Sequence, residues 1–201
     1  MAWCPTDPAI LLVGCANKRV VQYDVRAGTA VLEYNYHLGA VNTVTFIDDG
    51  RRIATTSDDR KVLVWEYGTP VPFAYHTDDT MFSITAAALH PDGDAWAGQS
   101  MDNQIVVYHA RDRTGLNRRK HFSGHIAAGY ACQVGFSPNG AYIVSGDGDG
   151  QVWVWDWKTS KVVKKFRAHD AGGPTIGVAW HPLHASMMAT CGWDGGLKLW
   201  E

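Results

Sequence analysis

The sequence predicts an all-β protein assembled from five similar units, and three observations support this prediction. Five short runs of alternating residues each end near an aromatic residue, and such alternation is typical of half-buried strands. Each aromatic residue follows a turn Asn or Asp by six positions. The spacings between successive aromatic residues are 42, 43, 47 and 45, and the residues are Tyr23, Trp65, Tyr108, Trp155 and Trp200. A period of this length indicates stacked supersecondary units.

Each unit contains four predicted strands in a fixed order. The first ends in turn residues, as in "VTFIDDG" and "VGFSPNG", and the second is an apolar run such as "RIATTS" or "YIVSGD". The third carries the aromatic residue, and the fourth is more polar, as in "RKHFSG" and "VVKKFR". Four antiparallel strands in each unit describe a β-propeller blade. We place the blades at about residues 1–36, 37–78, 79–124, 125–168 and 169–201.

Composition and charge exclude several classes of protein. Eighteen Lys and Arg against 20 Asp and Glu give a net charge of −2, which does not mark the whole chain as a nucleic-acid binder. No run approaches the ~20 apolar residues that span a bilayer, so we expect no membrane partner. The cysteines and histidines lack zinc-binding spacing. We therefore expect no metal, no cofactor and no small-molecule substrate.

The stretch "VSGDGDGQVWVWDW", residues 144–157, raises a calcium-binding alternative, because Asp147 and Asp149 are spaced like metal ligands. A calcium-binding EF-hand loop that began at Asp147 would need Gly at its sixth position and Glu at its twelfth. This chain has Val152 and Lys158 there. The turn acid also recurs in other repeats without a second acid two residues before it. We therefore interpret both acids as turn residues.

The third strands "VWVWD", "VLVWE" and "LKLWE" resemble those of the WD-repeat family, and the resemblance covers the entire chain. It implies a buried network in each blade: His before the first strand, Ser or Thr on the second, Asp in the turn and Trp on the third. Such a network supplies the donors that a buried carboxylate needs. Three repeats carry the complete set: His37, Thr55, Asp59, Trp65; His125, Ser145, Asp149, Trp155; and His169, Thr190, Asp194, Trp200.

Two repeats depart from this set, and we expect their blades to be looser or held by their neighbours. The residues at the corresponding positions are Val13, Asn17 and Tyr23 in the first repeat and Gly98, Asp102 and Tyr108 in the third.

Ser, His and Asp also make up the catalytic triad of hydrolases. A nucleophile, however, needs an accessible, singular site with an oxyanion hole. The sets found here recur three times and are predicted to be buried. We therefore expect a protein that is not an enzyme.

The chain begins inside a first strand and ends on a third, so we expect five blades, the last without its outer strand. The resemblance implies part of a seven-bladed ring, with roughly two further blades and a closing strand upstream. A closed five-bladed ring is the alternative, and it requires the first and fifth blades to pack together. An open arc would leave sheet edges unpaired.

Longer stretches narrow the resemblance to a spliceosomal family of WD-repeat proteins. These stretches include "QSMDNQIVVY", "GHIAAGYACQVGFSP" and "TCGWDGGLKLWE", and the similarity runs from about Lys18 to Glu201. The blade pattern itself does not demand "GYACQV" or "QSMDNQI". The resemblance implies a nuclear, non-enzymatic scaffold that contacts spliceosomal proteins around the second catalytic step of splicing. It also implies contact with the backbone of small nuclear or pre-messenger RNA.

Two surfaces are candidates for partner contact. The first is the turn rim, which we define as the residues just before each turn Asn or Asp, where apolar Met101 and Trp193 stand out; a Trp lying flat on its own blade is the alternative. The second is "RDRTGLNRRKHF", interpreted as a long connecting loop that could meet phosphate or acidic peptides. Its cations are Arg111, Arg113, Arg118, Arg119 and Lys120.

A function of another class remains open. "YDVR", Tyr23 to Arg26, resembles the W-D-x-R signature of WD-repeat substrate receptors of cullin-based ubiquitin ligases. Arg26 would serve that docking. Tyr stands where that signature has Trp, and one copy occurs.

Overall fold

The computed structural model describes residues 1–77, 80–170 and 172–201. Within these residues, five antiparallel sheets hold the 19 strands, and the helical element is the 3-10 turn η1 (Asp48–Gly50). The all-β propeller prediction is confirmed. The predicted boundary between the second and third blades, residues 78 and 79, lies outside the described residues.

Each sheet is built from consecutive strands paired in chain order. The first holds β1 (Ala2–Trp3), β2 (Ile10–Gly14), β3 (Val20–Asp24) and β4 (Thr29–Tyr34). The second holds β5 (Val41–Ile47), β6 (Arg52–Ser57), β7 (Val62–Glu66) and β8 (Pro72–His76). The third holds β9 (Ile84–Leu89), β10 (Ala95–Ser100), β11 (Gln104–His109) and β12 (Leu116–Ser123).

The remaining two sheets differ in strand number. The fourth holds β13 (Val134–Phe136), β14 (Tyr142–Gly146), β15 (Gln151–Asp156) and β16 (Val162–Arg167). The fifth has three strands, β17 (Thr175–Trp180), β18 (Met188–Gly192) and β19 (Leu197–Trp200). The absence of a fourth described strand in this sheet agrees with the prediction.

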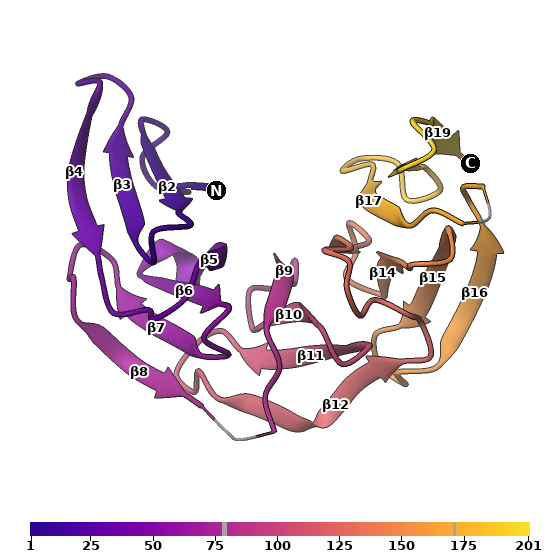
Figure 1. Cartoon of the computed structure of the whole chain (residues 1–201), viewed down its shortest axis with the longest axis horizontal. Helices are drawn as coiled ribbons and strands as arrows, with labels where there is room; N and C mark the ends of the chain where they lie inside the picture. The colour runs from indigo at the N-terminus through magenta and orange to yellow at the C-terminus, as the bar shows by residue number, and fades with distance from the viewer. Residues whose placement is uncertain (78–79, 171) are drawn as a thin grey trace.

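The sheets stand side by side along an open arc, with β4, β8, β12 and β16 on its convex side (Figure 1). The first and fifth sheets lie at opposite ends of the arc, which contradicts the five-bladed ring. Strand residues are more buried inside the arc than in the sheet at its end. All four residues Val62–Trp65 of the second sheet are buried, whereas Leu197 and Leu199 of the fifth are 81% and 66% exposed.

Apolar side chains from neighbouring sheets form the core between them. One cluster joins Leu12 and Tyr34 of the first sheet to Leu63 and Trp65 of the second. Three further clusters occupy the next three junctions. Burying one large aromatic side chain removes about 150–250 Å² from water, worth at most roughly 4–6 kcal/mol. This gain explains why aromatic residues recur at every repeat.

The outer strands carry bulges of two sizes. In the first, second and fourth sheets one residue is inserted in the outer strand: Val31, Phe73 or Val163. In the third sheet, Val106 and Tyr108 of β11 pair with His121 and Leu116 of β12, so residues 117–120 stand opposite Val107 alone. The larger bulge absorbs the residues that lengthen this repeat spacing to 47.

Candidate functional site

The structure brings together the four predicted network residues of the second blade. His37 Nδ1 lies 3.0 Å from Asp59 Oδ2, and His37 Nε2 lies 2.8 Å from Thr55 Oγ1. The indole N–H of Trp65 donates to the same hydroxyl oxygen at 2.9 Å. Strands β6 and β7 set this geometry, because Ile53 pairs with Trp65 and Thr55 lies two residues further along β6.

The electrostatics of this network favour a neutral imidazole beside an ionised carboxylate. Burial lowers the pKa of His37, although the neighbouring Asp59 opposes the shift. Burial alone would raise the pKa of Asp59, but hydrogen bonds from Leu38 N, His37 and Lys61 N outweigh it and leave the pKa below its usual range. The carboxylate thus accepts from His Nδ1–H, and Nε2 accepts from the threonine hydroxyl.

The fifth blade repeats this arrangement. His169 Nδ1 lies 2.9 Å from Asp194 Oδ1, and His169 Nε2 lies 2.9 Å from Thr190 Oγ1, which also accepts from Trp200 Nε1 at 2.9 Å. The backbone N–H of Gly196, together with that of Asp170 and the histidine, lowers the pKa of Asp194 to about 2.

The fourth blade departs from the prediction, because the expected hydrogen bonds among its four residues are replaced or missing. His125 Nε2 and Ser145 Oγ do not meet directly but share Gln99 Oε1 of the third blade, at 2.9 and 3.2 Å. Trp155 Nε1 donates to the carbonyl of Ser123 at 3.1 Å, and Asp149 is exposed. The physical reason is the reach of Gln99, whose side chain extends from β10 into the space between His125 and Ser145.

Asp147 takes the role that sequence analysis gave to Asp149. It is 1% exposed, and its Oδ2 accepts the indole N–H of Trp153 at 2.7 Å. Its Oδ1 accepts the backbone N–H groups of Asp149 at 3.0 Å and Gln151 at 2.8 Å. Sequence analysis missed this pair; the signal was a second Asp and a second Trp, each two residues before the predicted one.

The first blade, which lacks the four-residue pattern, has a different network of hydrogen bonds. Tyr34 OH donates to Gln22 Oε1 at 3.1 Å, and Gln22 Nε2 donates to Tyr67 OH of the second blade at 3.2 Å. In the third blade, the rings of Trp96 and Tyr108 stack 4.5 Å apart. The first blade is therefore joined to the second by a contact outside the four-residue pattern, and the third blade has an aromatic contact within its own sheet.

The buried networks offer no accessible nucleophile. Thr55 and Ser145 are 0% exposed and Thr190 is 1% exposed, so a substrate cannot reach these hydroxyls. Among the described residues, no group of three or more His, Cys, Asp or Glu side chains is placed to hold a metal ion. The same part of the chain contains no helix that is long and apolar enough to cross a membrane.

The turn rim contains one prominently exposed aromatic residue. Trp193 is 69% exposed, and its ring stands edge-on to Tyr130 at 5.5 Å between ring centroids. Tyr130 belongs to the "GYACQV" stretch of the neighbouring repeat. Met101, the other apolar rim residue, is half-buried. Met101 and Trp193 therefore do not form a single contact cluster on the turn rim.

The cationic stretch is not a simple connecting loop, which corrects the prediction. Residues 116–123 form the outer strand β12, so Arg118, Arg119 and Lys120 lie in its bulge. Lys120 Nζ sits 4.0 Å from the ring centroid of Trp157, a cation–π contact. Arg111 lies apart from this group.

Three arginines singled out in the sequence analysis lie in loops between strands. Arg111 Nε is paired with Asp94 at 2.7 Å, while Arg113 is exposed before β12. Arg26, the residue of the ligase-receptor alternative, binds both carboxylate oxygens of Asp7 at 3.0 Å.

Repeated antiparallel blades, two of which contain a His–Thr–Asp–Trp network, define a WD-repeat protein. The chain belongs to the family described as WD domain, G-beta repeat, which matches residues 28–66, 116–156 and 160–201. It is 50% identical over 192 residues to Pre-mRNA-processing factor 17 of Homo sapiens and of Mus musculus, covering 96% of this chain and 33% of each relative.

More distant relatives extend this similarity. Pre-mRNA-processing factor 17 of Saccharomyces cerevisiae is 31% identical over 194 residues, covering 95% of this chain and 42% of that protein. WD repeat-containing protein 25 of Mus musculus is 24% identical over 204 residues, covering 98% and 38%. The chain spans about a third of the length of the mammalian processing factors that it matches.

Proposed function

We propose that this chain is part of a nuclear, non-enzymatic scaffold that holds proteins of the spliceosome together around the second catalytic step of pre-mRNA splicing. The observation that carries the proposal is 50% identity to Pre-mRNA-processing factor 17 along 96% of the chain. Fold alone would not support it, because propellers serve many functions. The burial of every network hydroxyl supports a binding role rather than catalysis.

The Trp193–Tyr130 pair is the partner contact that we propose on the turn rim. A large aromatic side chain that keeps most of its surface in water gains free energy when a partner covers it. Trp and Tyr are also the residue types that dominate binding energy in protein interfaces. We include Met101 as a peripheral contact, because it is half-buried in the same rim.

The test is affinity purification of the tagged protein from cells, followed by identification of the RNAs and proteins that accompany it. We expect small nuclear RNAs and spliceosomal proteins. Recovery of a cullin adaptor without small nuclear RNAs would favour the ubiquitin-ligase alternative instead. The ion pair of Arg26 with Asp7 makes that alternative weaker, because docking through Arg26 would have to break it.

The Trp193→Ala variant tests the proposed contact within the same purification. We expect it to lose spliceosomal proteins, because a central aromatic contact is worth ~2 kcal/mol or more. Leu183→Ala is the matched control: Leu183 is 85% exposed in the same blade, but it lies in the loop at the other end of β17 and β18. Equal recovery from both variants and the unaltered protein would remove Trp193 from the interface.

A further inference from the structure

Positive charge is concentrated in two short segments of the sequence, residues 113–125 and 157–169. These segments contain half of the 18 Lys and Arg residues, and all 20 Asp and Glu residues lie elsewhere in the chain. A protein with a net charge of −2 therefore carries two segments whose Lys and Arg residues are not interrupted by Asp or Glu. Its members are Arg113, Arg118, Arg119, Lys120, Lys158, Lys161, Lys164, Lys165 and Arg167.

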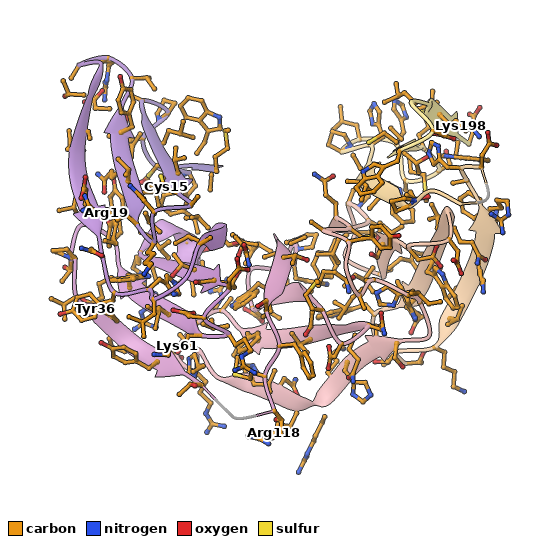
Figure 2. All side chains as sticks on the ribbon, viewed as in Figure 1. Cys15, Arg19, Tyr36, Lys61, Arg118 and Lys198 are labelled. Atoms are coloured by element: carbon orange, nitrogen blue, oxygen red, sulfur yellow. The ribbon has the colours of Figure 1, made fainter. Side chains whose placement is uncertain are left out.

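Folding places the two segments on neighbouring outer strands. The first supplies β12 and the second supplies β16 with the turn before it, and both strands lie on the convex side of the arc (Figure 1). Figure 2 shows the labelled Arg118 on this convex side. We call this surface the cationic edge, defined by the nine residues named above. It lies apart from the turn rim that carries Trp193.

The bulge in β12 distinguishes this strand from the outer strands of the other blades. Single inserted residues in the other outer strands are apolar, namely Val31, Phe73 and Val163, whereas the bulge of β12 consists of Asn117–Lys120. A bulge changes the direction of side chains and interrupts the ladder. It thereby presents a cluster of cations rather than an alternating edge.

A hollow of about 520 Å³ opens beside this bulge. Its walls come from β12 and from the turn before β16, and they present ammonium, guanidinium, hydroxyl and amide groups but no carboxylate. The lining residues are Asn117, Arg119, Lys120, His121, Ser123, Lys158, Thr159 and Ser160. The nearby carboxylate of Asp156 is engaged by the backbone N–H and hydroxyl of Thr159, both at 2.7 Å.

We propose that the cationic edge binds the phosphate backbone of single-stranded RNA, with the hollow as its central phosphate site. Nine cations, six on the two strands and three beside them, match a polyanion better than a single phosphate group, because the eight residues of β12 extend up to about 26 Å at ~3.3 Å per residue. The imidazole of His121 lines the hollow, whereas neighbouring Trp157 is covered by Lys120 and stacks on Phe122. Contacts to phosphate carry no sequence information, so we expect the binding to be independent of RNA sequence.

This inference deepens the proposed function by assigning the RNA contact of the scaffold to one surface. The assay measures fluorescence anisotropy of a labelled 20-nucleotide oligouridylate with the purified protein between 50 and 200 mM salt. For single strands, each phosphate contact contributes about 0.7 to the slope of log affinity against log salt. That slope corresponds to roughly 5-fold in affinity per contact at about 0.1 M salt.

The test variant is Arg119→Gln with Lys158→Gln, which removes two exposed cations from opposite walls of the hollow. We expect roughly 25-fold weaker binding and a salt slope smaller by about 1.4. The control is Lys18→Gln with Arg60→Gln, an equal charge change at exposed turns of the first two blades, and it should bind like the original protein. Exchanging the two cations, Arg119→Lys with Lys158→Arg, should preserve binding.

Three outcomes would overturn the inference: no RNA binding by the original protein, equal loss in test and control variants, or a multiply phosphorylated peptide that binds where oligouridylate does not. The last would assign the edge to a phosphoprotein. Failure here is distinguishable from failure of the splicing proposal. A purification without small nuclear RNAs contradicts the splicing proposal even if the purified protein binds oligouridylate, and unchanged anisotropy contradicts the cationic edge even if small nuclear RNAs co-purify.

Discussion

Replacing Asp147 by Ala should destabilise the protein far more than replacing Asp149 by Ala, although the repeat pattern points to the latter. Asp147 accepts three hydrogen bonds, at 2.7, 2.8 and 3.0 Å. Each donor left unsatisfied costs about 1–3 kcal/mol. Allowing water to reach the backbone donors, we expect a loss of about 3–5 kcal/mol. Asp149 is exposed, so its replacement should change the free energy of unfolding by about 0.5 kcal/mol or less.

Thermal unfolding followed by circular dichroism measures the difference. For a chain of this size, ~1 kcal/mol shifts the midpoint by about 2–4 °C, so Asp147→Ala should lower Tm by roughly 10 °C and Asp149→Ala by at most ~2 °C. Trp153→Phe removes the indole donor, and its effect should not add to that of Asp147→Ala. Equal shifts for the two aspartates, or strictly additive effects for Asp147 and Trp153, would refute the reasoning.

Three further outcomes follow from the same contacts. Thr55→Val should cost about 2–4 kcal/mol in urea unfolding, because it strands an imidazole and an indole, whereas Ser145→Ala should cost about 1 kcal/mol; equal costs would contradict this. Burial lowers the pKa of His125 to about 4. In the unfolded chain this histidine has an ordinary pKa near 6.5, so the unfolded state takes up the proton first as pH falls. The free energy of unfolding should therefore drop by up to roughly 3 kcal/mol between pH 6.5 and 4. Replacing His125 by Gln should flatten that dependence in urea titrations, and an unchanged slope would count against it. Gly146→Ala places its Cβ against the Thr175 carbonyl, so Tm should fall by several degrees, and an unchanged Tm would show that the fourth and fifth blades can separate there.

The period of the aromatic residues was sufficient to predict the sheets, because a blade buries large side chains on both faces wherever it has two neighbours. Trp65, Trp155 and Tyr108 are all 0–1% exposed. The same physical requirement acts on every repeat, so it leaves a repeated mark in the sequence. The His–Thr–Asp–Trp networks of the second and fifth blades follow equally from the pattern.

The fourth-blade network could not be predicted from the pattern, because a buried polar group needs a partner but not a particular one. Gln99 lies on a neighbouring blade, and no spacing within the fourth repeat contains it. Asp147 satisfies the turn amides and an indole in place of Asp149. A rule that assigns partners by position fails wherever a second residue of the right chemistry lies within reach.

The same buried positions recur from blade to blade because they form the core. These positions therefore do little to distinguish one propeller from another. Differences accumulate where a blade faces water, since an inserted residue there costs little packing. The repeat spacing of 47 already signalled extra residues in the third repeat, but only the register shows that they widen the bulge of β12 rather than a loop. This placement puts Arg119 and Lys120 in one wall of a hollow whose other wall comes from the next blade. Partner choice in this chain is therefore expected to depend on outer strands and turns, and Arg119→Gln with Lys158→Gln, which touches neither core nor network, tests that expectation separately from folding.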